Sequence, residues 1–138
     1  MSTKAEIIEF MQQEFAQSSI SILEVKDRGS VVQLEVGDTH LRPGGTVSGP
    51  TLMTVADLAL YVAIFGVIGI VPLAVTTNIN FNFMRKPAAD KAIVGVCKLL
   101  KIGRSLAVGE VFIYSDGMVD PVAHVMGTYS IPTKSNHS

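Results

Sequence analysis

Residues 42–63 read RPGGTVSGPTLMTVADLALYVA, and this stretch decides which fold the chain can adopt. It begins as a glycine-rich loop, and from Pro50 the sequence stays almost wholly apolar to about Val71. Proline suits the first turn of a helix, because its missing N–H would have no partner there. Pro72 ends the run, because a helix rarely continues through proline. The pattern predicts a long central helix over about residues 50–70.

An apolar run of this length is also compatible with a membrane span, which needs about 20 apolar residues. However, Asp57 interrupts the run, and the continuous apolar stretch covers only Leu58 to Val71. The segments that follow have the pattern of a sheet, which would not naturally follow a lone span. Burial against a curved sheet and a partner subunit better explains a helix that is apolar on nearly all sides. We therefore expect no membrane partner.

The rest of the chain predicts one more helix and six strands. Apolar residues between Lys4 and Phe15 have helical spacing, which indicates an N-terminal helix over about residues 3–16. The tail at residues 133–138 is polar. We therefore expect one α+β domain over residues 1–138. Turn residues separate the strand-like segments, which cover residues 20–26, 31–36, 74–84, 92–102, 106–114 and 122–131.

Composition narrows the class of protein and of partner. Hydrophobic residues make up 48% of the chain and charged residues 17%, which is too apolar for disorder and apolar for a small monomer. Burial between identical subunits is the simplest explanation. The net charge of −1 provides no basic face for nucleic acid. The single cysteine excludes an internal disulfide, and the N-terminus has no signal-peptide pattern, so we expect a cytoplasmic protein.

Asp57 is the only charged residue between Arg42 and Arg85. Burying a charge costs free energy unless the charge has a partner or a function. An ionisable residue in such a setting is therefore a candidate catalytic group. The alternative is that Asp57 points outward from a polar stripe that includes Thr54.

The same segment resembles the hotdog-fold acyl-CoA thioesterases, most closely the PaaI-like thioesterases of the phenylacetic acid pathway. In that family a glycine-rich loop and an HGG motif open the central helix, and an acidic residue follows nine positions after the His. Here Ser48-Gly49-Pro50 occupies the place of the motif, and Asp57 follows Ser48 by nine. Residues 76–88 and 101–114 resemble the strand and the hairpin that follow. The resemblance implies a hotdog fold, a curved antiparallel β-sheet wrapped around a long central helix.

The reaction that this resemblance implies is hydrolysis of an acyl-CoA thioester to the free acid and coenzyme A. By the family pattern, the Gly49 N–H polarises the thioester carbonyl, and Asp57 activates water or attacks directly. Thr76 falls where similar proteins carry a hydroxyl that helps to hold substrate or water. The start of a helix favours developing negative charge, which suits Gly49 for this role. No cofactor is implied, because coenzyme A is part of the substrate.

The spacing of Gly49 and Asp57 has a consequence for the implied site. Eight residues along one helix correspond to about 12 Å along its axis. One carbonyl carbon cannot lie within bonding reach of both groups. If both act, Asp57 comes from another subunit, and we expect a homodimer or a homotetramer built from such dimers.

Alternation along the strand at 74–84 separates two sets of side chains. We expect Thr77, Ile79, Phe81 and Phe83 to face the helix, and Thr76, Asn78, Asn80 and Asn82 to form a polar stripe on the other face. Thr76 and Asn78 are the candidates for substrate contact. The alternative is that the asparagines only face solvent or an interface.

Cations near the ends of strands are candidates for binding the phosphates of coenzyme A. Arg104, which follows Gly103 in a tight turn, is the first choice. The other candidates are Arg85, Lys86 and Lys101. For each of the four, the alternative is a solvated side chain on the surface.

Three positions depart from the family pattern. Ser48 replaces the His, although serine can still hydrogen-bond and begin a helix. Pro50 replaces the second Gly of the motif, and Arg42 stands where similar proteins often carry Asn. All three are candidate substrate contacts. Arg42 either faces the acyl pocket and favours an acyl carboxylate, or binds phosphate, or is solvated.

These departures keep a second function open, a catalytically weak acyl-CoA-binding or regulatory protein. A hotdog dehydratase or hydratase fits poorly, because such enzymes usually need a His and none lies near the start of the helix. Cys97 lies in an apolar run and is expected to be a buried thiol rather than a nucleophile. The three histidines, His40, His124 and His137, have no metal-ligand spacing, so we expect no metal.

Overall fold

The computed structural model describes residues 3–14, 20–37, 47–70, 74–88 and 90–132. Every predicted helix and strand occurs among these residues, with bounds that differ from the expected ones by two residues at most. The polar tail at 133–138 lies outside the described residues. In chain order the elements are α1 (Lys4–Glu14), β1 (Ile20–Lys26), β2 (Gly29–Leu34), α2 (Gly49–Ile68), β3 (Val75–Phe83), β4 (Ile93–Ile102), β5 (Leu106–Ser115) and β6 (Ala123–Ser130).

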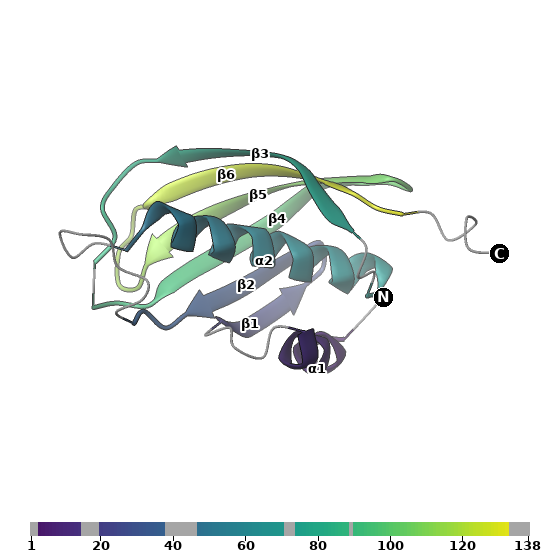
Figure 1. Ribbon diagram of the computed structural model, residues 1–138, viewed down its shortest axis with the longest axis horizontal. Helices are drawn as coiled ribbons and strands as arrows, with labels where there is room; N and C mark the ends of the chain where they lie inside the picture. Colours follow the sequence, from purple (N-terminus) through teal and green to yellow (C-terminus); the bar gives the residue numbers. More distant parts are fainter. Residues whose placement is uncertain (1–2, 15–19, 38–46, 71–73, 89, 133–138) are drawn as a thin grey trace.

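The six strands form one antiparallel sheet in the order β1-β2-β4-β5-β6-β3. Figure 1 shows this sheet curving around α2, with α1 beside β1 at one side. The predicted α+β class and the sheet wrapped around a long helix are both confirmed. Strand β3, which follows α2 in the chain, pairs only with β6 and is therefore an edge strand of the sheet.

Local signals in the sequence set both ends of α2. Ser48 is the N-cap in an extended conformation, and its hydroxyl accepts a hydrogen bond from the Thr51 N–H. Pro50 lies in the first turn, as predicted. The helix ends at Gly69, whose φ of 91° suits glycine and whose N–H donates to the Phe65 carbonyl at 2.9 Å. The cap that replaces the family His is therefore a sound helix start.

Helix α2 supplies much of the core. By length and composition alone it is apolar enough to cross a membrane, but 56% of its most apolar window is buried inside the structure. Buried side chains cover most of the circumference of α2, because the sheet covers one side of the helix and α1 also contacts it, while Met53 and Thr54 are exposed. The buried residues are Leu52, Val55, Ala56, Leu58, Ala59, Leu60, Val62, Ala63, Ile64 and Phe65.

Leu60 of α2 packs directly onto the sheet. Gly109 of β5 and Gly127 of β6 are direct cross-strand partners, and together they form a recess for the Leu60 side chain. A Cβ added at Gly109 would lie 2.7 Å from Leu60 Cδ2, and one at Gly127 would lie 2.6 Å from Leu60 Cδ1. Both distances are too short for real carbon atoms, so a larger residue at either position would displace the Leu60 side chain from the recess.

A second contact ties the middle of α2 to the sheet. The Ser30 hydroxyl of β2 is fully buried and donates to the Ala59 carbonyl at 2.6 Å. A buried hydroxyl needs such a partner, and this one adds a directional bond to the apolar packing. The depth of α2 and its position along the sheet are therefore both defined next to Asp57.

We expect Gly127→Ala to lower the free energy of unfolding by about 1–3 kcal/mol, because the added methyl overpacks the recess that holds Leu60. Gly103→Ala is the matched control, since a Cβ there meets only the Leu106 carbonyl oxygen at 3.6 Å. Chemical denaturation of the two variants tests the difference. Combining Gly127→Ala with Leu60→Val should restore part of the loss. Equal stability of the two single variants would contradict the recess.

Candidate active site

The Asp57 carboxylate is half-buried on the wall of α2 and is held by two hydroxyls from the sheet. Thr76 Oγ1 donates to Asp57 Oδ1 at 2.7 Å. The Tyr129 hydroxyl lies 2.5 Å from the same Oδ1 and 3.0 Å from the main-chain carbonyl oxygen of Asp57. Asp57 therefore points toward β3 and β6, and the alternative of an aspartate pointing away into solvent is excluded.

A β-bulge brings Thr76 to this position. Thr76 pairs with Tyr129 and Asn78 pairs with Thr128, so Thr77 is an extra residue on β3. Thr76 consequently lies on the same face of the sheet as Ile79 and not on the face of Asn78. The predicted grouping of Thr76 with the asparagines was wrong, because the bulge reverses the alternation at this point.

The bulge also corrects two other expectations. Thr77 does not face the helix but is exposed, and its hydroxyl donates to the Thr128 carbonyl at 3.3 Å. Asn78 was a candidate substrate contact, yet it points to the outer face, where its side-chain oxygen accepts from Asn80 at 3.2 Å. Ile79 and Phe81 pack on the core side as predicted.

Tyr129 is a site residue that the sequence did not reveal. It is 2% exposed, and its ring stacks on Tyr61 with the centroids 6.0 Å apart. Burial, together with the negative charge of Asp57 and the hydrogen bond to it, raises the pKa of Tyr129 well above its ordinary value. The hydroxyl therefore stays protonated at neutral pH and is a permanent donor. Its distance of 72 residues from Asp57 leaves no local signal.

The start of α2 provides a backbone donor. Thr51 N–H bonds back to Ser48, and Pro50 has no N–H. Among the described residues, none accepts a hydrogen bond from the Gly49 N–H. This group therefore remains available at the positive end of the helix dipole. Ser48 serves as the cap and Pro50 lines the groove described next.

A groove of about 450 Å³ lies between the first half of α2 and β3. Its helical wall follows one stripe, at spacings of three and four residues, that ends at Asp57. Asp57 is the one charged residue among the described residues that line it, and most of the remaining wall is apolar. The lining comprises Pro50, Met53, Thr54, Asp57, Thr76, Ile79 and Phe81.

Two aromatic rings continue this wall to the start of α2. Phe81 and Phe83 stack with centroids 5.9 Å apart and ring planes 5° apart. The ring of Phe83 reaches Gly49, where an added Cβ would lie 3.6 Å from Phe83 Cζ. Phe83 is nevertheless 54% exposed, which leaves an apolar surface beside the free backbone donor.

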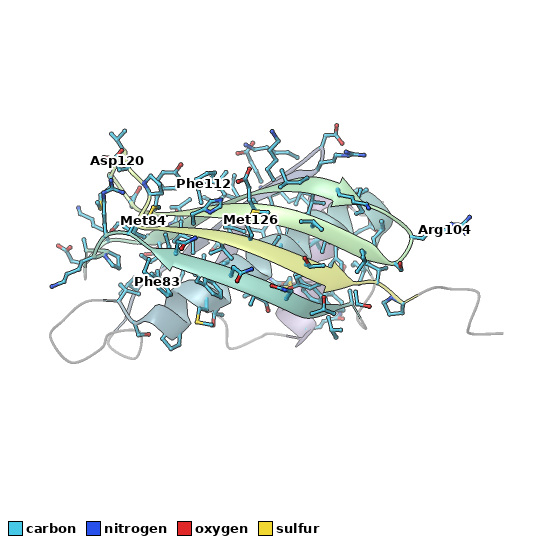
Figure 2. All side chains as sticks on the ribbon, turned by 90° about the horizontal axis from the view of Figure 1, so that it is seen from above. Phe83, Met84, Arg104, Phe112, Asp120 and Met126 are labelled. Carbon is cyan, nitrogen blue, oxygen red and sulfur yellow. The ribbon has the colours of Figure 1, made fainter. Side chains whose placement is uncertain are left out.

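The predicted phosphate-binding cations lie at two opposite ends of the sheet. Figure 2 shows Arg104 at one end and Phe83 and Met84 at the other. Arg104 and Gly103 form the turn between β4 and β5, where the Gly103 N–H bonds the Leu106 carbonyl, and Lys101 is exposed nearby on β4. Within the described part of one chain, the predicted phosphate-binding cations therefore do not form a single cluster.

The cations that follow β3 belong to the other end. Arg85 Nη1 donates to the Pro121 carbonyl at 2.7 Å, and Nη2 lies 4.0 Å from an Asp120 oxygen. Lys86 is exposed. Arg42 lies outside the described residues.

The remaining candidates lie away from the groove. Cys97 is 3% exposed, so the prediction of a buried thiol is confirmed, and burial raises the pKa of this thiol to about 12. His124 Nε2 lies 2.9 Å from a Glu110 oxygen, on the face of the sheet opposite α2. His40 and His137 lie outside the described residues. No three metal-binding side chains come together within the part of the chain that the structure describes.

Comparisons with known proteins support this description. The sequence profile of the thioesterase superfamily matches residues 44–122. A candidate thioesterase from Silicibacter sp. TM1040 is 41% identical, with a TM-score of 0.86 over 94% of this chain and 91% of that one. No curated protein matches the chain in sequence.

More distant solved structures share the fold. The E. coli PaaI protein is 19% identical, with a TM-score of 0.80 over 93% of this chain and 90% of that one. A hypothetical thioesterase from Streptococcus pneumoniae, solved with coenzyme A, is 20% identical, with a TM-score of 0.77 over 92% and 97% of the two chains. The sheet wrapped around α2 is therefore the hotdog fold.

Proposed function

The chain belongs to the thioesterase superfamily, and we propose that it hydrolyses an acyl-CoA thioester to a free acid and coenzyme A. The observation that carries this proposal is the Asp57 carboxylate, oriented by two hydroxyls at the wall of an apolar groove. A free carboxylate oxygen next to an apolar acyl site is what general-base or nucleophilic attack on a thioester requires. The structural neighbour solved with coenzyme A is consistent with a substrate of this class.

In the proposed reaction, Asp57 takes a proton from water as the water oxygen attacks the thioester carbonyl carbon. The Gly49 N–H stabilises the negative charge that develops on the carbonyl oxygen. The intermediate then collapses, the carbon–sulfur bond breaks, and Asp57 returns the proton to the leaving thiolate. Direct attack by Asp57 is the alternative, and it forms an anhydride that water must cleave. Neither route needs a cofactor.

We further propose that each site combines two copies of the chain. Gly49 and Asp57 both belong to α2 and are about 12 Å apart along its axis. The edge strand β3 contacts Asp57 near its start, through Thr76, and ends at Phe83, next to Gly49. Antiparallel pairing of two β3 edges would therefore bring Asp57 of one copy toward Gly49 of the other.

The same pairing would bring the separated cations together. Arg104 lies at the end of the sheet where β3 begins, and Arg85 and Lys86 follow the end where β3 stops. Two copies related by a two-fold axis would place Arg104 of one near Arg85 and Lys86 of the other. Such a group of cations suits the phosphates of coenzyme A.

We expect Asp57→Asn to fold normally and to lose turnover by about 100- to 10,000-fold, because the amide can act neither as base nor as nucleophile. Release of free thiol from a panel of acyl-CoAs measures this loss. Hydrolysis in one turnover in H₂¹⁸O, followed by mass spectrometry of the Asp57 peptide, tests direct attack, since label enters the carboxylate only when water cleaves an anhydride at the Asp57 carbonyl carbon. Parental turnover by the variant would exclude the mechanism. A parent protein that binds acyl-CoA without hydrolysis would support the binding-protein alternative.

Gly49→Pro should lower kcat about 100-fold or more, because it removes the donor while a proline still suits the helix start. Ser48 already has the extended φ and ψ, −70° and 151°, that precede a proline. Gly49→Ala keeps the N–H and is the matched control.

Mixed dimers of Gly49→Pro with Asp57→Asn test the shared site directly. If each site combines two copies, one site of the mixed dimer keeps both functional residues, and about half of the parental activity returns. If each site belongs to one chain, both sites carry one defect and no activity returns. Sedimentation of the parent as a stable monomer would also contradict the shared site.

Neutral acyl groups should be preferred over acyl groups that carry a carboxylate. The described groove wall is largely apolar, and its one charge is the negative Asp57. Burying an unpaired substrate carboxylate there costs enough for at least a roughly tenfold loss in kcat/KM. Hexanoyl-CoA and adipoyl-CoA form a matched pair of equal chain length. The reverse order, removed by Arg42→Ala, would show that Arg42 pairs with the acyl carboxylate.

A further inference from the structure

We infer that Tyr129 is a positioning residue that fixes the Asp57 carboxylate so that Oδ2, and not Oδ1, acts on the substrate. The inference rests on the proposed function and adds to it the residue that selects the reacting oxygen. Tyr129 belongs to β6 and is buried, so it would act on the substrate only through Asp57.

The two donors converge on one carboxylate oxygen. Thr76 Oγ1 lies 2.7 Å and the Tyr129 hydroxyl 2.5 Å from Asp57 Oδ1. A carboxylate oxygen accepts along two lone-pair directions, and two donors occupy both. None of the described residues donates to Oδ2. This oxygen therefore keeps its lone pairs for a water or a thioester carbon.

Tyr129 is the more rigid of the two donors. Its ring is held by burial and by stacking on Tyr61, with 29° between the ring planes. Its hydroxyl also lies 3.0 Å from the Asp57 main-chain oxygen, so its one proton is shared between the carboxylate and the helix backbone at this residue. Thr76, in contrast, lies on the edge strand and is partly exposed. Without Tyr129, the carboxylate could turn about its last side-chain bond and exchange its two oxygens.

The cross-strand pairing of Thr76 with Tyr129 explains how both hydroxyls reach one atom. The two residues are direct partners on β3 and β6, and both point toward α2. The bulge after Thr76 allows this residue and the groove residues Ile79 and Phe81 to share that face. The arrangement therefore serves the carboxylate and the acyl groove together.

The test compares Tyr129→Phe with the parent. Phenylalanine keeps the ring and its packing and removes only the donor. We expect kcat to fall about tenfold or more, as for loss of one hydrogen bond to a charged group, while KM stays within about twofold. Tyr114→Phe is the matched control, because it removes a hydroxyl from the outer face of β5 and should leave both constants unchanged. Replacing Tyr129 by 4-aminophenylalanine, which restores a donor, should recover part of kcat.

A double-mutant cycle with Thr76→Val gives a second readout. Because both donors hold the same oxygen, their effects should not be independent. The fold-loss in kcat of the double variant should therefore be smaller than the product of the fold-losses of the two single variants. If Tyr129→Phe does not fold, Thr76→Val alone makes the same prediction of a fall in kcat without a change in KM. Melting temperatures measured in parallel separate a positional effect from a loss of structure.

The outcomes distinguish this inference from the proposed function. An active Asp57→Asn overturns the proposed function. An inactive Asp57→Asn together with a Tyr129→Phe of parental kcat overturns the positioning role alone. A fall in kcat that follows the melting temperature across Tyr129→Phe and Thr76→Val, with no recovery by 4-aminophenylalanine, also overturns it.

Discussion

The depth at which α2 lies against the sheet is the constraint on which the rest of the structure depends. Leu60 occupies a recess whose floor is the glycine pair Gly109 and Gly127, and a Cβ on either would collide with it. A helix that lies this deep has little surface left for solvent, which explains why its sequence is apolar nearly all round. It also brings the main chain at residues 57–59 within hydrogen-bonding distance of side chains on the sheet.

Two sheet hydroxyls use this proximity. Ser30 donates to the Ala59 carbonyl, and the Tyr129 hydroxyl lies beside the carbonyl and the carboxylate of Asp57. The helix is therefore held in rotation and in translation at the turn that carries the candidate catalytic residue. Preorganisation of this kind lowers the cost of arranging charged groups when a reaction begins. Structural packing and the candidate chemistry thus depend on the same few contacts.

The position of β3 at the edge of the sheet gives the site its open character. The groove between α2 and β3 is bounded by one chain on two sides only, and the stacked rings of Phe81 and Phe83 extend its apolar wall toward Gly49. An unpaired strand edge next to an exposed apolar surface favours association with another strand. The proposed shared site would explain both the high apolar content of the chain and the separation of Gly49 from Asp57 along one helix.

The sequence by itself determined the elements and the family. Pro50, Ser48 and Pro72 are local signals, since proline and a capping hydroxyl act on the residues next to them. Helical spacing indicated the N-terminal helix, and alternation indicated strands. The sequence also showed that Asp57 is the only charged residue in a long apolar run. The face of Thr76 was not, because a bulge depends on which residues pair across β3 and β6. Tyr129 could not be found for the same reason, since its role arises from a contact between residues 72 positions apart. Neighbouring residues determine the helices, the strands and the helix ends, and so the sequence predicts them. Strand register and long-range contacts are decided only when the strands pair and the helix packs on them.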